Sequence, residues 1–164
     1  MNHQLTTARL ALTPAGAADL ATVLAHWRDA HVRRFLFDDE LLAEAEVTDI
    51  LTASESDFAT HGYGLWLARD QGALIGTVGL RPLDDLGIEV TYSLDPSAWG
   101  LGYATEMAGA VIDHAFTKVG LTEVLAEIDE GNIGSRRVVE KLGMVPFATV
   151  PGVLGAMIRY RLRK

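Results

Sequence analysis

Two glycines separated by one residue lie between a strand-like stretch and a helix-patterned stretch, in the segment SAWGLGYATE. The strand-like stretch is GIEVTYSL, and the apolar run from about Gly102 to Val119 has helical spacing and ends at Gly120. Because glycine costs conformational entropy on folding, Gly100 and Gly102 indicate backbone that approaches a bound group closely. Free N–H groups at a helix start commonly bind an anion, so the segment predicts an anion-binding loop.

The remaining sequence patterns predict alternating strands and helices around this loop. We expect the following elements in chain order: a short strand in ARLALT, a helix beginning at Thr13-Pro14, a helix from about Asp39 to Ala59, two strands joined by a turn at Asp70–Gly72, the strand GIEVTYSL, the helix after the glycines, the strand TEVLAEI, a helix from Asn132 to Gly143, and two strands ending in GAMIRYRLR. This order predicts a mixed sheet with parallel pairing at its centre and hairpins at its N-terminal side.

Length and composition narrow the class of protein. A chain of 164 residues predicts one domain, residues 1–164. The absence of cysteine excludes a disulfide scaffold, a thiolate metal site and a cysteine nucleophile, and it suits a cytoplasmic protein. Neither a signal peptide nor a membrane-spanning run is recognisable. The histidines lack metal-ligand spacing, so we expect no metal site.

The charge is strongly asymmetric along the chain. The net charge is −8, and residues 35–68 hold eight acids without a lysine or arginine. A solvated helix face is one interpretation, and a negative rim that attracts a cationic ligand is the other. A chain this acidic is a poor candidate for binding nucleic acid.

Several known phosphate-binding motifs contain closely spaced glycines, and each can be compared with this segment. A P-loop needs a lysine after its glycines, and none follows here. A dinucleotide fingerprint needs a third glycine where this chain has Thr105, and the loop does not follow an opening strand. A purely structural turn and the pyrophosphate loop of a coenzyme A transferase remain as interpretations.

The stretches EVTYSLDPSAWGLGYATEM and EIDEGNIGSRRVVEKLGM resemble the GNAT acetyltransferase superfamily. Together with LTTARLALTP and HWRDAHVRRFL, they resemble more narrowly its branch named for ribosomal-protein N-terminal acetyltransferases. The superfamily loop is written [QR]-x-x-G-x-[GA], and this chain departs from it with Ser97 in the first position. The resemblance implies an α+β GNAT fold: a mixed, mostly antiparallel sheet of about seven strands, splayed in the middle and flanked by about four helices.

The resemblance also implies acetyl-CoA as co-substrate. Backbone N–H groups at the helix start would bind its pyrophosphate, the splayed strand would pair with its pantetheine arm, and Asn132 would both cap a helix and contact that arm. The candidate cofactor-binding residues are Tyr92, Ser93, Leu94, Trp99, Gly100, Leu101, Gly102, Tyr103, Ala104, Thr105 and Asn132.

Acetyl transfer to an amine requires a base, an oxyanion donor and an acid for the departing thiolate. Glu89, on the polar face of its strand, is the candidate base, acting through water, although it would also suit a solvent-facing position. Ser135 is the candidate acid, and Tyr160 is a reserve, because Phe147 stands where many superfamily members have a tyrosine. A backbone N–H near Tyr92–Leu94 is the candidate oxyanion donor.

These observations predict an N-acetyltransferase that moves an acetyl group from acetyl-CoA to a primary amine by direct attack. The acceptor would be a protein N-terminus or a small-molecule amine, and a cationic one if the acidic segment frames its entrance. A non-catalytic acyl-CoA sensor on the same fold is the alternative. No nucleic-acid or membrane partner is expected, and a homodimer is compatible with the resemblance, although no motif here indicates one.

Overall fold

The computed structural model describes residues 2–164 and contains one eight-stranded mixed sheet. In spatial order the strands are β1 (Leu5–Thr6), β2 (Ala11–Pro14), β3 (Leu65–Asp70), β4 (Ala73–Leu83), β5 (Gly87–Leu94), β6 (Glu123–Asp129), β8 (Gly155–Arg163) and β7 (Val145–Gly152). All neighbouring strands are antiparallel except β5 and β6, which run parallel. The sheet is therefore mixed, as the sequence predicted, with one strand more than expected.

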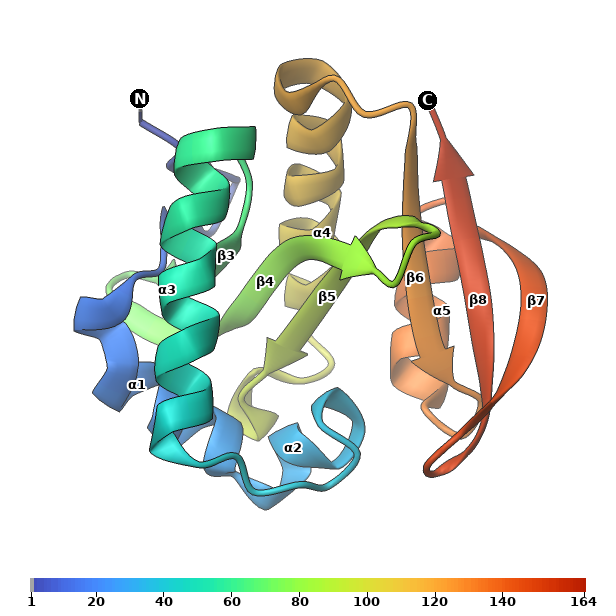
Figure 1. Ribbon diagram of the computed structural model, residues 1–164, viewed down its shortest axis with the longest axis horizontal. Coiled ribbons are helices and arrows are strands. Elements are labelled where there is room, and N and C mark those ends of the chain that lie inside the picture. Colours follow the sequence, from blue (N-terminus) through green and yellow to red (C-terminus); the bar gives the residue numbers. More distant parts are fainter. Residues whose placement is uncertain (1) are drawn as a thin grey trace.

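Five α-helices cover the two faces of the sheet (Figure 1). They are α1 (Leu20–Arg28), α2 (Ala30–Leu36), α3 (Glu44–His61), α4 (Tyr103–His114) and α5 (Ile133–Lys141). The first three pack on one face, around a cluster that includes Trp27 and Leu51. The other face is covered by α4 and α5, over a larger cluster that includes Met107 and Val139. In residues 2–164, no helix combines the length and the apolar character needed to cross a lipid bilayer.

The central elements begin and end close to their predicted positions. Strand β5 covers the whole of GIEVTYSL, and the turn between β3 and β4 contains Gln71 and Gly72 with positive φ. Helix α4 continues through a wider π turn, Ala115–Val119, and stops at Gly120, whose φ is 86°. For these elements, the boundaries predicted from local sequence match those in the folded structure.

The predicted helix start at Thr13-Pro14 is wrong. Pro14 is the last residue of β2, and the Ala15 N–H donates a 2.8 Å hydrogen bond to the Leu65 carbonyl, so strand pairing continues past the proline. Ala15 is buried against the neighbouring strand, and α1 begins only at Leu20. Tertiary pairing thus overrides a local capping signal.

The predicted helix from Asp39 to Ala59 begins too early, and the helix before it was not expected. Asp38 and Asp39 both have positive φ and form a turn, so α3 starts at Glu44. The preceding α2 is a short helix capped by Asp29, whose carboxylate accepts from the N–H groups of His31 and Val32. The structure thus has five α-helices, one more than predicted.

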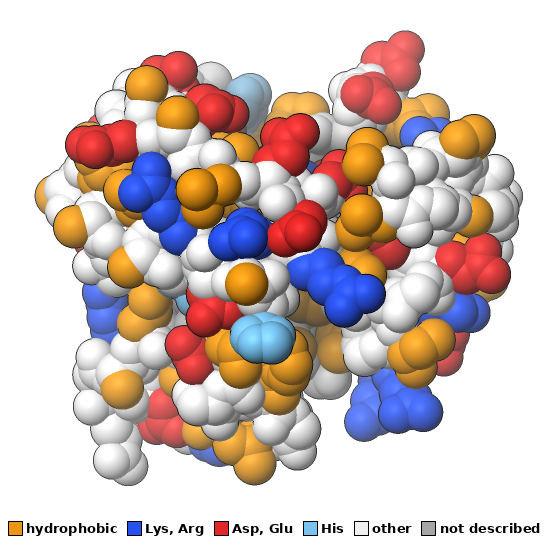
Figure 2. Space-filling view, turned by 90° about the horizontal axis from the view of Figure 1, so that it is seen from below, with side chains coloured by type: hydrophobic (Ala, Val, Ile, Leu, Met, Phe, Trp, Pro, Cys, Tyr) orange, Lys and Arg blue, Asp and Glu red, His pale blue; other side chains and the backbone are white. Residues whose placement is uncertain are grey.

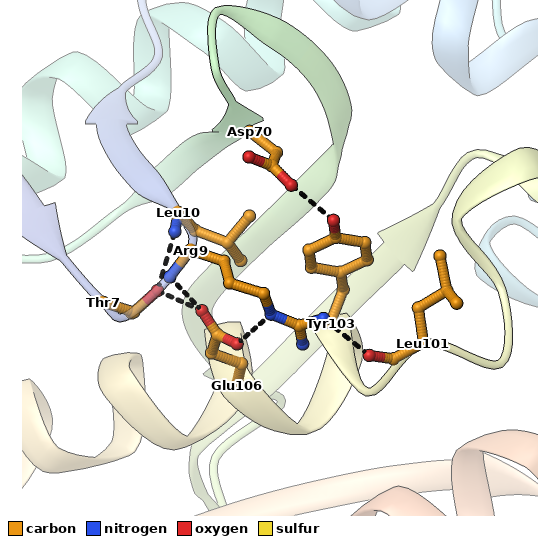
Figure 3. Close-up of polar contacts among 7 residues, drawn as sticks. All are labelled: Thr7, Arg9, Leu10, Asp70, Leu101, Tyr103 and Glu106. Atoms are coloured by element: carbon orange, nitrogen blue, oxygen red, sulfur yellow. Dashed lines mark hydrogen bonds and ion pairs between the residues drawn. The ribbon is translucent and has the colours of Figure 1, made fainter.

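A polar cluster ties the turn between β1 and β2 to the start of α4 (Figure 3). Glu106 accepts hydrogen bonds from the Thr7 hydroxyl, from the Arg9 N–H at 2.9 Å and from Arg9 Nε at 2.8 Å. Arg9 also donates to the Leu101 carbonyl at 2.8 Å and lies 4.1 Å from the centre of the Tyr103 ring. The Tyr103 hydroxyl donates to Asp70 on β3. The N-terminal hairpin therefore supports the glycine loop from outside.

Replacing Glu106 by glutamine is expected to destabilise the protein near neutral pH. Partial burial opposes ionisation, but the hydrogen bonds from Thr7 and Arg9 outweigh it and lower the pKa of Glu106. A group with a lowered folded-state pKa stabilises the protein above its unfolded pKa of about 4.3 and loses that effect as the pH falls. Urea unfolding should show a loss of about 1–3 kcal/mol at neutral pH, shrinking in acid.

Glu140→Gln, on the exposed side of α5, is the matched control, because it removes the same charge away from this cluster. If both variants showed the same stability from neutral to acidic pH, the cluster would contribute nothing to folding.

Candidate active site

The strands β5 and β6 separate at the centre of the sheet. Their register contains one pair, Glu89 with Leu125, and beyond it the two strands diverge toward their carboxyl ends (Figure 1). A cleft of about 700 Å³ lies there, lined by residues of α2, β5, β6, the start of α5 and the loop before α4. This volume is typical of small-ligand sites in proteins. Seen from below, acidic and basic side chains intermingle with hydrophobic ones across the middle of the molecule (Figure 2).

The two glycines shape the end of the cleft next to α4. Gly100 and Gly102 have φ values of 74° and 82°, in the left-handed region that other residues avoid. Gly102 is the N-cap of α4 and has no side chain that could accept a hydrogen bond from the first turn. The Glu106 N–H makes the first bond back to the Gly102 carbonyl, at 3.1 Å, so the preceding N–H groups have no partner within the helix. Such a terminus can bind an anion.

The predicted cofactor-binding residues divide into two groups. Those that line the cleft are Tyr92, Ser93, Leu94, Trp99, Gly100, Ala104 and Asn132. The others, Leu101, Gly102, Tyr103 and Thr105, belong to the loop and the first turn of α4, outside the lining of the cleft. Within this second group, the Tyr103 side chain points away toward Asp70 (Figure 3).

Trp99 differs from the other tryptophans. Trp27 and Trp66 are buried, as expected of packing residues, but Trp99 is 52% exposed. Its indole N–H donates to the Leu94 carbonyl at 3.1 Å, and its ring meets His31 of α2 edge to face, with centroids 6.0 Å apart. The loop before α4 therefore contacts both the end of β5 and α2 across the mouth of the cleft.

The start of α5 forms the opposite wall. The Asn132 side chain accepts from the Ser135 N–H at 3.2 Å, which is the predicted capping contact. The Tyr92 hydroxyl donates to the Ser135 carbonyl at 3.0 Å and thereby joins β5 to α5. Ser135 lines the cleft, whereas Tyr160, the reserve acid, is buried in the apolar core outside that lining, with Arg136 at 3.4 Å from its hydroxyl.

Glu89 lies at the point where the strands separate. It is 4% exposed rather than solvent-facing, lines the cleft, and accepts a 2.9 Å hydrogen bond from Arg81 Nε. Burial raises the pKa of Glu89, and Arg81 only partly offsets this effect. A buried carboxyl with a raised pKa can take up a proton more readily than an exposed one.

Two further acids share the face of the sheet on which Glu89 lies. Because Glu89 pairs with Leu125 and side chains alternate along a strand, Glu127 and Asp129 point to the same side as Glu89. Both line the cleft, as does Asp38 from the turn after α2. Glu127 and Asp129 were not predicted from the sequence, although the alternation in EVLAEID resembles that of GIEVTYSL.

For the acidic segment of residues 35–68, the structure favours the solvated-face interpretation over the negative rim. Of its eight acids, Asp38 alone lines the cleft. Others have local contacts elsewhere: Glu46 accepts from the Ala43 N–H and Glu55 from the Ala17 N–H. The negative charge in the cleft comes mainly from β5 and β6.

A buried chain of hydrogen bonds fixes β5 to α1. Ser93 Oγ lies 2.8 Å from His26 Nε2 and 2.8 Å from the Thr77 hydroxyl, which accepts from Trp27 at 3.2 Å. Burial lowers the pKa of His26, so its ring is neutral near pH 7. These contacts hold the cleft side of β5 in place.

Comparison with known proteins places the chain in a family. Residues 9–145 match the model of the acetyltransferase (GNAT) domain. The chain is 26% identical over 178 residues to the FsC-acetyl coenzyme A-N(2)-transacetylase of Aspergillus fumigatus, covering 98% of this chain and 76% of that protein. It is 37% identical over 89 residues to the uncharacterized protein YkkB of Bacillus subtilis, covering 51% of this chain and 52% of that protein.

The fold also occurs in solved structures. A GnaT-family acetyltransferase structure from Bordetella pertussis superposes with a TM-score of 0.82 at 24% identity, covering 96% of this chain and 98% of that one. Three observations point to the same family. They are the opening between β5 and β6, the glycine loop before α4, and the match to the family over residues 9–145. The chain belongs to the GNAT family of acetyltransferases.

Proposed function

We propose that this GNAT acetyltransferase transfers an acetyl group from acetyl-CoA to a primary amine, either a protein N-terminus or a small-molecule amine. The observation that carries the proposal is the cleft between β5 and β6, which joins the glycine loop at one end to buried carboxylates at the other. The narrower resemblance to the ribosomal-protein N-terminal acetyltransferase branch, based on the motifs quoted above, belongs to this proposal as well.

The cofactor would lie along β5. The first-turn N–H groups of α4 and the positive end of its dipole suit the pyrophosphate. Beyond Glu89 the outer edge of β5 pairs with no strand in residues 2–164, so its backbone can bond the amides of the pantetheine arm. Asn132 and Trp99 line the two sides of that path.

The chemistry follows from the groups beside the thioester. Glu89, acting through a water molecule, accepts the proton of the acceptor's ammonium, and the freed amine attacks the thioester carbonyl. Backbone N–H groups near Tyr92–Leu94 stabilise the negative oxygen that develops. As the C–S bond breaks, the thiolate takes a proton from the Ser135 hydroxyl, the attacking nitrogen releases its surplus proton to solvent, and Ser135 recovers a proton from solvent.

A non-catalytic acyl-CoA sensor on the same fold is the alternative. A sensor needs the glycine loop and the edge of β5 but has no use for a buried, proton-accepting carboxyl beside them. The position of Glu89 therefore favours the enzyme. Release of free coenzyme A thiol from acetyl-CoA, measured across a panel of amines, separates the two functions, since a sensor releases none.

Gly102→Val is expected to weaken acetyl-CoA binding at least about tenfold, because a β-branched residue strains the left-handed backbone that presents the α4 N–H groups. Gly120→Val is the matched control: it strains a helix end of similar φ, 86°, away from the cleft. Calorimetric titration with acetyl-CoA measures both. Equal dissociation constants for acetyl-CoA in the two folded variants would mean that the glycine loop does not belong to the cofactor site.

Glu89→Gln is expected to lower kcat about 100-fold to 10,000-fold while leaving the dissociation constant of acetyl-CoA nearly unchanged. Because burial raises the pKa of Glu89, wild-type kcat should rise with pH through that raised value, as the carboxylate forms. The variant should lose this limb of the pH profile. Asp85→Asn, an exposed acid on the loop after β4, serves as the control and should keep it. An unchanged profile in Glu89→Gln would mean that another group is the base.

A further inference from the structure

Of the three acids of β5 and β6 that line the cleft, one has no cationic partner among residues 2–164. Glu89 is paired with Arg81 at 2.9 Å, and Glu127 with Arg159 at 2.7 Å. Asp129 also lines the cleft and is 3% exposed, yet its Oδ1 is buried without a hydrogen-bond partner among residues 2–164. Three acids thus share one face of the sheet, and the pairing arginines neutralise two of them.

An unpaired buried carboxylate is costly, so its partner should be sought among ligands. Burial raises the pKa of Asp129, and the negative charges of Asp38 and Glu127 raise it further. Two other basic side chains line the cleft: Arg34 is exposed and lies over the Phe35 ring, 5.1 Å from its centre, and His31 meets the Trp99 ring edge to face. A positive group from a ligand would therefore relieve the repulsion at Asp129.

The position of Asp129 separates it from the reacting centre. Leu125 is the strand partner of Glu89, and Asp129 lies four residues beyond it. Four residues of a strand span about 13 Å, so Asp129 is about 13 Å further along β6. The cleft is continuous between the two carboxyl groups. A slender acceptor can therefore have its reacting nitrogen near Glu89 and a second charged group near Asp129.

We propose that Asp129, assisted by Asp38, binds a second ammonium group of the acceptor, so that the substrate is a small diamine or polyamine rather than a monoamine. This inference rests on the proposed function and specifies its substrate class. The cleft also has to hold the pantetheine arm, which favours a flexible polymethylene chain over a bulky acceptor. Asp129 is then a specificity-determining residue at a distance from the base.

The test compares acceptors that differ only in the second charge. Thiol release from acetyl-CoA is measured with diamines from ethylenediamine to octamethylenediamine, and with the amino alcohol of each length, in which a hydroxyl replaces one ammonium. After correction for the two equivalent amines, the best diamine should exceed its amino alcohol in kcat/KM by about 10-fold to 100-fold, the value of a charge-assisted hydrogen bond.

Asp129→Asn should abolish this advantage and leave kcat/KM for the amino alcohols within about twofold. Glu130→Gln is the matched control: it removes the same charge from the next residue, which is exposed and outside the lining of the cleft, and it should retain the preference. Titration with acetyl-CoA verifies that each variant is folded. Asp129→Ser replaces the asparagine variant if that variant does not bind acetyl-CoA.

The outcomes distinguish the two proposals. If wild-type protein releases no thiol with any amine, the proposed function fails. If amines react but diamines have no advantage, or keep it in Asp129→Asn, the function stands and the role of Asp129 is wrong. The small-polyamine assignment is likewise overturned if a lysine-containing dipeptide amide outperforms every diamine.

Discussion

The separation of β5 from β6 after a single strand pair is the constraint on which the rest of the structure depends. Before that point the two strands belong to one sheet, and after it each presents an unpaired edge to a common cleft. The direction of β5 then leads the chain through Trp99 and the two glycines into α4. The glycine loop, the strand edge and the carboxylates therefore meet because one pairing stops early.

The elements around the cleft hold this opening in a defined shape. On one face, His26 and Trp27 of α1 bond to Ser93 and Thr77, which fixes β5 and β4 from below. On the other face, Tyr92 reaches the start of α5. The two side chains come from adjacent residues of β5 and point in opposite directions, as a strand requires. A short stretch of strand is thus held from both sides of the sheet.

The local signals in the sequence predicted the parts of the fold that local physics controls. Gly100 and Gly102 need a left-handed backbone, and the boundaries of β5 coincide with its alternating pattern. Helix α2 was missed because it is seven residues long and carries two arginines and a histidine, which hides any apolar face. The cleft acids depend on the register of β5 against β6, which a single sequence does not specify. Thr13-Pro14 shows the converse, a strong local signal overruled by pairing with β3.

The early end of pairing between β5 and β6 also divides the molecule mechanically. The portion formed by β6, β8, β7 and α5 is joined to the remainder by one strand pair, by the Tyr92 contact and by an apolar cluster shared with β4, β5 and α4. A region joined to its neighbour by one strand pair can open as a separate cooperative unit, with its own protection against amide exchange. A ligand lying between the strands would contact both units and couple their opening. Binding and release of the substrate would then change how the protein unfolds, in addition to their role in catalysis.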